Sequence, residues 1–431
     1  MKEKWQGMTM KKLLIHNIGL LATPEGKTAR GGAAQGKIRK LENAWLLANE
    51  KGLITEIGQG PAPDTFGVFT VINAGGRLVT PGLVDAHTHL VFGGWRQNEF
   101  GLKLRGASYL EILEAGGGIL STVKATRAAT EEELAEKAGK ALKEMLSYGV
   151  TAVEAKSGYG LDRETELKQL RAIGRLNQEG PVELAATYLG AHALPAEYKE
   201  NREEYLRLLT EEWIPEIARE GLAEFCDVFC EKGVFTAEET RRILEAGKRY
   251  GLVPKIHADE IEAIGGTELT AELGAVSAEH LIVCQESGIR ALAAGGTIAC
   301  LLPMTSLYLG AAFAPAREMI NAGVPVAVAS DFNPGSCPGL NLQLAMTMAC
   351  LRYRLTPEEM LTAVTLNGAA AINRADRLGS LEVGKQADLV IWKAGDLEYL
   401  PYRLGSNLAD VVIKKSEVVW VNEYCHPEAA F

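Results

Sequence analysis

The sequence lacks the cysteine pattern of a disulfide-stabilised or zinc-knuckle protein. Its seven cysteines are scattered, odd in number and without a CxxC pair. Such a set does not form a disulfide framework, so we expect a reducing environment. Long apolar runs are also missing, since none approaches the roughly 18 residues of a transmembrane helix. No cleavage site follows the basic start of the chain, and we therefore expect a cytoplasmic protein without a membrane partner.

Positive charge is in deficit. The chain has 55 acidic and 45 basic residues, which gives a net charge of -10. This balance argues against nucleic acid or an anionic membrane as a general partner and leaves a small molecule as the expected substrate. With 431 residues, 47% of them hydrophobic, the chain is of a size to form a large globular domain with a smaller one attached.

Short β-rich segments alternate with helical segments from about residue 79 onwards. Eight apolar strands separated by helices favour a closed parallel (β/α)8 TIM-like barrel, although periodicity alone does not exclude an open doubly wound α/β sheet. Capping boxes that begin with Thr130 and Thr236 mark the starts of two of the helices. The predicted strands are 78–87, 150–155, 182–189, 225–230, 253–258, 275–281, 297–303 and 324–330.

Both ends of the chain differ from this pattern. Residues 1–78 and 379–431 contain short β-like pieces separated by glycine-rich turns. Neither end offers enough strands to bury an apolar face alone. We therefore expect the two ends to pair into one small β-sandwich domain, and residues 79–378 to form the barrel domain that carries the chemistry.

Histidine is scarce, and its placement is informative. Five of the seven histidines lie at or just beyond the predicted carboxyl ends of strands, and Asp331 directly follows the eighth strand. In a barrel these ends converge on one face, where active sites lie. A single histidine is more often a satisfied core residue than a ligand, so the weight rests on the coincidence. The five are His87, His89, His192, His257 and His280.

Four of these side chains suit one metal ion. His87 and His89 are two residues apart in an extended segment and therefore point the same way. With His257 and Asp331 from other strands they offer three imidazole nitrogens and one carboxylate. Three His ligands, an Asp and an open position fit one catalytic Zn²⁺ or iron ion, as Fe²⁺ or Fe³⁺.

The chain resembles the amidohydrolase superfamily over nearly its whole length. The resemblance is carried by the segments PGLVDAHTHL, HADE, AEHL, SDFNPGS and LGSLEVGKQADLVIW. The further segments HTHLVFGGWR, AKSGYGL and YLGAHALP resemble those members that open the ring of 4-imidazolone-5-propanoate to N-formimidoyl-L-glutamate in histidine degradation. The resemblance implies a metal-dependent barrel with a β-sandwich built from both termini, assembled as a homodimer.

The resemblance also implies residue roles. His87, His89, His257 and Asp331 match the metal ligands. Glu260 matches an acid/base carboxylate, and His280 matches a residue that orients water or stabilises the oxyanion. The positions that match substrate contacts are Arg96, Tyr159, His192, Glu260, Asn333, Gly335 and Ser336.

These roles define a reaction. A bound metal lowers the pKa of water from about 15.7 to about 7, and the hydroxide then attacks the ring carbonyl before the cyclic amide C–N bond breaks. We expect Asp331 to relay the proton to the leaving nitrogen, with Glu260 as its rival and His280 as a further catalytic residue. The planar guanidinium of Arg96 suits the propionate carboxylate.

Three alternatives remain open. A mononuclear deaminase acting on a purine- or pyrimidine-like ring would share the same histidines, and a catalytically dead barrel would be a scaffold. A second metal would require a lysine after the fourth strand, where Lys232 lies nearby. Lys156 is expected to be an ion-pair partner rather than a catalytic amine.

Overall fold

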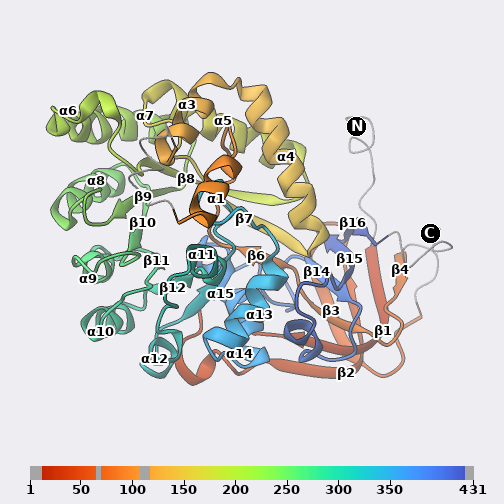
Figure 1. Cartoon of the computed structure of the whole chain (residues 1–431). Coiled ribbons are helices and arrows are strands. Elements are labelled where there is room, and N and C mark those ends of the chain that lie inside the picture. Colours follow the sequence, from red (N-terminus) through yellow and green to blue (C-terminus); the bar gives the residue numbers. More distant parts are fainter. Residues whose placement is uncertain (1–11, 65–68, 107–116, 423–431) are drawn as a thin grey trace.

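An eight-stranded parallel sheet forms the centre of the fold (Figure 1). The computed structural model describes residues 12–64, 69–106 and 117–422. A parallel bridge between Thr88 and Phe332 joins the segments that follow the first and last strands, so the sheet closes into a barrel. The strands, in spatial as well as chain order, are β6 (Leu83–Asp85), β7 (Val150–Lys156), β8 (Glu183–Ala191), β9 (Phe225–Cys230), β10 (Val253–Ala258), β11 (Ser277–His280), β12 (Ile298–Leu301) and β13 (Val326–Val328).

The predicted barrel is confirmed, with one change at its first strand. The predicted bounds 225–230 and 253–258 coincide with β9 and β10. The predicted strand 78–87 is instead two strands, because β5 (Leu78–Pro81) joins a different sheet and only β6 enters the barrel. Gly82 lies between them against Thr151, where a side chain would clash.

Helices cover the outside of the barrel (Figure 1). Thr130 and Thr236 form the predicted capping boxes with Glu133 and Glu239. The helices between barrel strands begin with α1 (Gln97–Leu104), α3 (Ile119–Ala128), α4 (Glu131–Ser147), α5 (Arg163–Glu179), α6 (Arg202–Arg207) and α7 (Ile214–Glu220). They continue with α8 (Ala237–Arg249), α9 (Gly266–Leu273), α10 (Glu286–Gly295), α11 (Pro303–Leu309) and α12 (Ala316–Asn321). After the barrel come α13 (Leu342–Arg352), α14 (Pro357–Ala363), α15 (Leu366–Ala371) and α16 (Tyr399–Tyr402). Among the described helices, none has the length and apolar character needed to span a bilayer.

Strands from both termini form a second sheet, as expected. Figure 1 shows the red N-terminal and blue C-terminal strands side by side, at one side of the barrel. The order is β16-β15-β14-β5-β1-β2-β3, with β4 also paired to β1. Apolar residues from strands near both edges, such as Ile54 and Ile413, share one core cluster, so the sheet curves around its own core. The bounds are β1 (Lys12–Thr23), β2 (Arg39–Ala48), β3 (Ile54–Gln59), β4 (Phe69–Asn73), β14 (Leu389–Trp392), β15 (Ala409–Lys414) and β16 (Glu417–Val421).

The barrel interior changes in character along its axis. At the end where the strands begin, small and apolar side chains such as Val84 and Ala152 pack with Leu366 and Ala369 of α15 in one buried cluster. Toward the carboxyl ends of the strands, the inward positions carry charged side chains and then histidines. The apolar end therefore provides the packing, and the polar end is left for chemistry.

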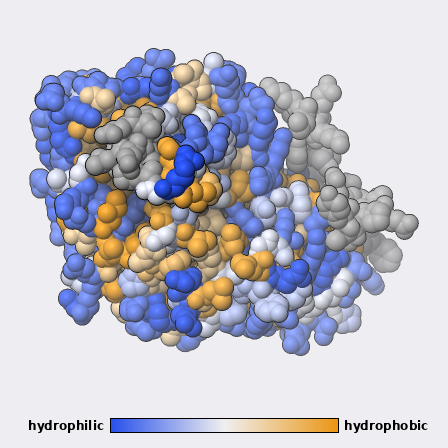
Figure 2. Space-filling model, in the orientation of Figure 1, coloured by the Kyte–Doolittle hydropathy of each residue, from blue (hydrophilic) through white to orange (hydrophobic). Residues whose placement is uncertain are grey.

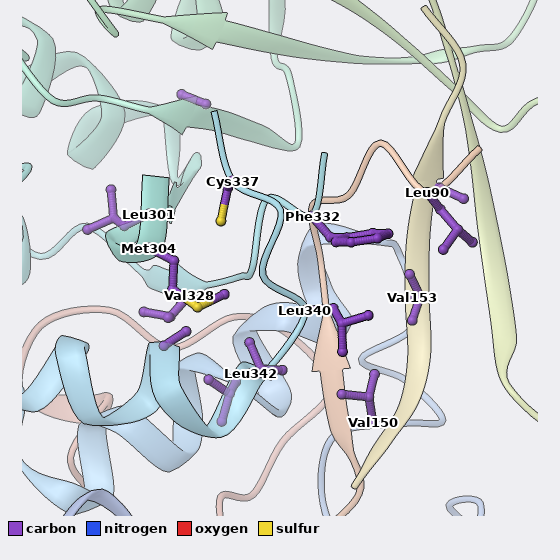
Figure 3. Packing of buried hydrophobic residues seen from close by; sticks show 14 of the residues in the cluster. Leu90, Val150, Val153, Leu301, Met304, Val328, Phe332, Cys337, Leu340 and Leu342 are labelled. Atoms are coloured by element: carbon purple, nitrogen blue, oxygen red, sulfur yellow. The ribbon is translucent and has the colours of Figure 1, made fainter. Parts of the chain in front are cut away.

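The segment after β13 is anchored by apolar packing. Figure 3 shows Phe332 and Leu340 facing the strand that carries Val150 and Val153, with Leu342 on the other side, toward Val328. Phe332, Leu340 and Leu342 belong to the main core cluster and are at most 8% exposed. Because Phe332 directly follows Asp331, this packing fixes the position of the carboxylate at the mouth of the barrel.

Candidate metal centre and substrate cavity

The four predicted metal ligands come together at the carboxyl ends of the strands. Asp331 Oδ1 lies 3.5 Å from His87 Nε2 and 3.6 Å from His89 Nε2. His257 Nε2 lies 3.4 Å from His89 Nε2. All four side chains are at most 3% exposed. The structure thus brings the sequence-predicted set into one buried cluster.

The residues present fit a divalent cation. His87 Nε2 and Asp331 Oδ1 are buried polar atoms without a hydrogen-bond partner among the described residues, and they face each other. Ligands about 2.1 Å from a tetrahedrally coordinated ion stand about 3.4 Å apart, close to the spacings of this cluster. Leaving such groups unpaired costs about 1–3 kcal/mol each, and a cation would remove that cost. Among the described residues, three triads that share His87 have metal-binding spacing: His87–His89–Asp331, His87–His257–His280 and His87–Glu279–Cys300.

The imidazoles are held in a form that can bind a metal. Burial, reinforced by neighbouring positive groups, lowers the pKa values of His87 and His89 well below the usual range, so both rings are neutral. His87 Nδ1 is 2.6 Å from Glu279 Oε2, and His257 Nδ1 is 2.9 Å from Asp227 Oδ2. Burial lowers the pKa of His257, but the Asp227 carboxylate more than offsets this and raises it. In both rings Nε2 is the nitrogen left to face the other ligands.

Two site residues adopt an uncommon backbone conformation. His280 and Asp331 have φ values of 71° and 55°, in the left-handed region that side chains disfavour by roughly 1–2 kcal/mol. Hydrogen bonds hold the backbone there, because Asp331 N donates to His87 O. Strain of this kind concentrates at functional sites, and here it turns both side chains toward the cluster.

Glu260 and His280 lie together on the wall of the site. Glu260 Oε2 is 3.6 Å from His280 Nε2. Burial, with Asp331 as a nearby negative charge, raises the pKa of Glu260 to about 8. Burial likewise raises the pKa of Asp331 to about 6, although the bond from Thr305 Oγ1 to Oδ2 (2.5 Å) opposes the rise. The site therefore pairs a carboxyl group that holds its proton at neutral pH with one that releases it, the arrangement that acid/base catalysis requires.

A cavity of about 370 Å³ opens above the cluster. Every predicted site residue lines this cavity except His87, which lies beneath it. Its volume suits a small ring with a short side chain rather than a polymer. The predicted residues that line it are His89, Arg96, Tyr159, His192, His257, Glu260, His280, Asp331, Asn333, Gly335 and Ser336.

Arg96 is fixed against the cavity wall by two features. Its Nε donates to Glu99 Oε2 at 3.2 Å, which leaves the terminal nitrogens for other partners. Those nitrogens lie against Gly335, where any side chain would clash with the guanidinium. Gly335 matches a substrate contact in the family resemblance, and in the structure its lack of a side chain makes room for Arg96. Glu99 was not anticipated from the sequence, although its i,i+3 spacing from Arg96 is a usable signal.

Asn333 shapes the turn that carries Gly335 and Ser336. Its Oδ1 accepts from both Gly335 N and Ser336 N at 2.8 Å, and its Nδ2 donates to Asp331 O at 2.8 Å. The amide is therefore largely used within the turn. Asn333 lines the cavity mainly as a support for its neighbours.

Tyr159 and His192 form the opposite wall. His192 stacks on His89 with ring centroids 4.9 Å apart, and its Nδ1 lies 2.9 Å from Gly158 O. Burial and the nearby His257 lower the pKa of His192 to about 3, so the ring stays neutral. Burial raises the pKa of Tyr159, which keeps its hydroxyl as a hydrogen-bond donor.

The two lysines considered from the sequence are both outside the cavity lining. Lys232 is 67% exposed and pairs with Glu262, so it does not point toward the cluster. Lys156 is buried and lies 2.9 Å from Glu154 and 2.8 Å from Asp227, as an ion-pair partner. The charged residues around Lys156 were not predicted as a group.

Comparison with known proteins agrees with this geometry. The Amidohydrolase family model matches residues 78–421. The chain is 50% identical over 415 residues to an imidazolonepropionase of Alkaliphilus metalliredigens, covering 95% of this chain and 98% of that protein. It is 52% identical over 412 residues to an imidazolonepropionase of Alkaliphilus oremlandii, covering 94% and 97%.

Solved structures show the same fold at low sequence identity. A 5-methylcytosine deaminase from Klebsiella pneumoniae has a TM-score of 0.72 at 19% identity, covering 95% of this chain and 98% of that one. The E. coli guanine deaminase has a TM-score of 0.72 at 15% identity, covering 95% and 99%. These solved structures show a likeness of fold alone. The two imidazolonepropionases, in contrast, are about 50% identical to this chain over nearly its whole length. The chain therefore belongs to the amidohydrolase family and, within it, to the imidazolonepropionases.

Proposed function

We propose that this protein hydrolyses 4-imidazolone-5-propanoate to N-formimidoyl-L-glutamate, the ring-opening reaction that its family name describes. The observation that carries the proposal is the combination of a metal-binding cluster with a partly buried arginine that lines the same small cavity. The ring would lie over His89 and Asp331, and its propionate would reach Arg96. A bare purine or pyrimidine has no carboxylate to use that arginine.

The cation would be held by His87, His89, His257 and Asp331. When bound, it supplies Lewis-acid activation of water, whose pKa falls to about 7. Three imidazoles and one carboxylate suit zinc or iron, and we propose a single ion of either kind. The exposed position of Lys232 supports one ion rather than two.

The protein's own side chains would move the protons. Asp331 Oδ1, which has no hydrogen-bond partner within the described part of the chain, would accept the proton of the attacking water. Glu260, protonated below about pH 8, donates to the departing ring nitrogen or to the ring itself. His280, held beside Glu260, stabilises the oxyanion that forms at the ring carbonyl.

Arg96 and its neighbours would bind the side chain of the substrate. Two terminal guanidinium nitrogens can contact both oxygens of a carboxylate. Glu99 holds Nε on the other side, so the fork is fixed before the substrate arrives. Tyr159, His192 and Ser336 line the same cavity and contribute donors and ring surface.

Substrate turnover tests the proposal directly. Purified protein loaded with Zn²⁺ or Fe²⁺ is incubated with imidazolonepropanoate and, separately, with cytosine and guanine. We expect loss of the imidazolone absorbance and formation of the formimino product by mass spectrometry, with no ammonia from either base. Ammonia release without imidazolone turnover would contradict the proposal, and an analogue with ethyl in place of propionate should show a raised KM because Arg96 loses its partner.

The assembly and location are also proposed. The six described cysteines are free, which is consistent with a reducing cytoplasm. Figure 2 shows apolar side chains gathered on one face of the barrel, and exposed apolar residues of α11, α13 and α16 include Leu307, Leu351 and Tyr402. Such a surface supports a homodimer. Light scattering coupled to gel filtration gives the mass that decides this.

A further inference from the structure

Five charged side chains are buried inside the barrel beneath the histidine cluster. They come from alternate, inward-facing positions of β7, β9, β10 and β11. Each is at most 1% exposed. The five are Glu154, Lys156, Asp227, Lys255 and Glu279.

These side chains form one continuous chain of contacts. Lys156 Nζ lies 2.8 Å from Asp227 and 2.9 Å from Glu154. Lys255 Nζ lies 3.0 Å from the same Glu154 and 3.5 Å from Glu279. The contacts therefore run from Asp227 to Glu279 across the width of the barrel.

Both ends of this chain contact a histidine of the metal cluster. Glu279 Oε2 is 2.6 Å from His87 Nδ1. Asp227 Oδ2 is 2.9 Å from His257 Nδ1. His87 and His257 are therefore connected through the buried charged side chains on their Nδ1 side, as well as through the histidine cluster on their Nε2 side.

Stability alone does not account for such a cluster. Removing an ion from water costs several kcal/mol even in a real protein, and well-packed apolar side chains in place of a buried ion pair are often neutral or stabilising. The neighbouring interior layer is apolar, so the fold can fill this space without charge. We therefore look for the role of these five charged residues in the histidine cluster that lies above them.

We propose that this buried network positions His87 and His257 for metal binding. Each carboxylate takes the Nδ1 side of one ring, which fixes the ring orientation and leaves Nε2 for the cation. Lys156 and Lys255 act one step further away, because they hold Asp227 and Glu279 in place. The five are positioning residues, and the inference rests on the proposed metal-dependent function.

The network and Asp331 together carry a formal charge that balances a divalent ion. Its three carboxylates exceed its two lysines by one formal negative charge, and Asp331 adds a second. A divalent cation bound beside them balances these two charges. Loss of a lysine would leave carboxylates facing one another without a counter-charge, and their geometry would relax.

Metal affinity in substituted proteins tests the network. Glu279→Gln and Asp227→Asn keep side-chain shape and remove charge, and Lys255→Met removes the distant cation. Asp388→Asn is the matched control, since Asp388 is also buried and charged but pairs with Lys414 in the terminal sheet. Holoprotein is challenged with a chelator, and the Zn²⁺ dissociation constant and release rate are measured for each variant. Circular dichroism checks that each variant is folded.

We expect the three network variants to bind Zn²⁺ about 10- to 100-fold more weakly, and the control to bind within about twofold of the parent. The rise in Tm on adding Zn²⁺ should also shrink in the network variants only. Cobalt-substituted Asp227→Asn and Glu279→Gln should show altered visible bands, which a purely structural role would leave unchanged.

Two results would overturn the inference in distinguishable ways. If the parent protein binds neither Zn²⁺ nor Fe²⁺, the proposed function fails together with the network. If the parent binds metal and folded Glu279→Gln and Asp227→Asn bind it equally well, only the network role fails. Should Lys255→Met not fold, these two shape-preserving variants carry the test.

Discussion

Asp331 has one oxygen for structure and one for chemistry. Oδ2 accepts the hydroxyl of Thr305, while Oδ1 faces the histidines without a hydrogen-bond partner among the described residues. We expect Asp331→Asn to lower kcat by at least about 10²-fold with the fold intact, because the amide can neither take a proton nor bind a cation as strongly. Steady-state kinetics and circular dichroism measure the two effects. Thr305→Val should cost less, and full activity of Asp331→Asn would remove this residue from the mechanism.

Glu260 carries a prediction about pH. Its pKa, raised to about 8 by burial and by Asp331, keeps the acid form below that pH. If the acid form donates the proton, kcat declines as pH rises through this pKa, and a bound cation moves the decline to somewhat lower pH. Glu260→Gln should lower kcat by about 10²- to 10⁴-fold with a smaller change in KM. The Glu260→Gln variant should also lose the decline of kcat at alkaline pH. If the decline is unchanged, it belongs to a group other than Glu260.

The sequence alone pointed to the candidate ligands but not to the residues that support them. His87, His89, His257 and Asp331 stood out because histidine is rare and each lies at or just beyond the carboxyl end of a predicted strand. Glu154 lies within the predicted apolar strand 150–155, and burial of its charge is not visible in a hydropathy pattern. Lys156 was expected to be an ion-pair partner, but its partners could not be named. The spacing of two residues between Glu154 and Lys156 was the available signal. Partners such as Asp227 and Lys255 lie on other strands, and only the closed barrel brings them together.

At the scale of elements, α5 organises the loop that carries Tyr159. Glu166, near the start of the helix, accepts from Gly158 N at 3.0 Å and from Gly160 N and Leu161 N at 2.9 Å. These backbone donors have no other way to be satisfied so close to a cavity wall. The helix thus fixes the loop through one carboxylate.

We expect Glu166→Gln to raise KM about 3- to 10-fold and to change kcat less, because a neutral amide bonds fewer of these donors and the loop relaxes. Kinetics with imidazolonepropanoate give both constants. Lys124, which is an exposed residue of the neighbouring helix α3, offers a matched surface control as Lys124→Gln. An equal effect of both substitutions would remove the loop-positioning role of Glu166.

Strand boundaries were predictable where the whole apolar run belongs to a single sheet. β9 and β10 match their predicted bounds because apolar runs there end at clear turns. The run 78–87 failed as a single strand because Leu78–Pro81 is just as apolar as Leu83–Asp85 but pairs with β1 and β14. The hydropathy of a segment predicts that it is a buried strand, but it does not indicate which sheet the strand joins. That choice is set by tertiary pairing.

At the scale of the whole molecule, the barrel and the terminal sheet meet at Glu183. This residue begins β8, and Lys414 of β15 lies 3.5 Å from it. Arg374 lies 3.1 Å away and Arg377 also pairs with it, both from the segment after α15. One carboxylate therefore joins three parts of the chain, at the end of the barrel away from the histidines.

This contact predicts how stability depends on pH. Burial raises the pKa of Glu183, but Arg377, Lys414 and Arg374 more than offset this and lower it from 4.5 to about 2. A carboxyl whose folded pKa is depressed stabilises the protein above its unfolded pKa, and that stabilisation is lost as pH falls toward the folded value. We expect Glu183→Gln to lower the free energy of unfolding by about 2 kcal/mol at pH 7, after screening at the partly exposed edge. Urea denaturation at pH 7, 5, 4 and 3 measures the difference between the two proteins.

The difference should be constant from pH 7 to about 5, shrink below about pH 4.5 and be roughly halved near pH 3. Glu132→Gln provides the control, because Glu132 is 76% exposed and 3.9 Å from Arg175, so it should change stability by less than about 0.5 kcal/mol at any pH. A difference for Glu183→Gln that stays the same from pH 7 to 3 would show that packing, not charge, joins the two sheets here. Activity per folded molecule should stay at the parent level, since Glu183 lies at the start of its strand and the cavity lies beyond the strand ends.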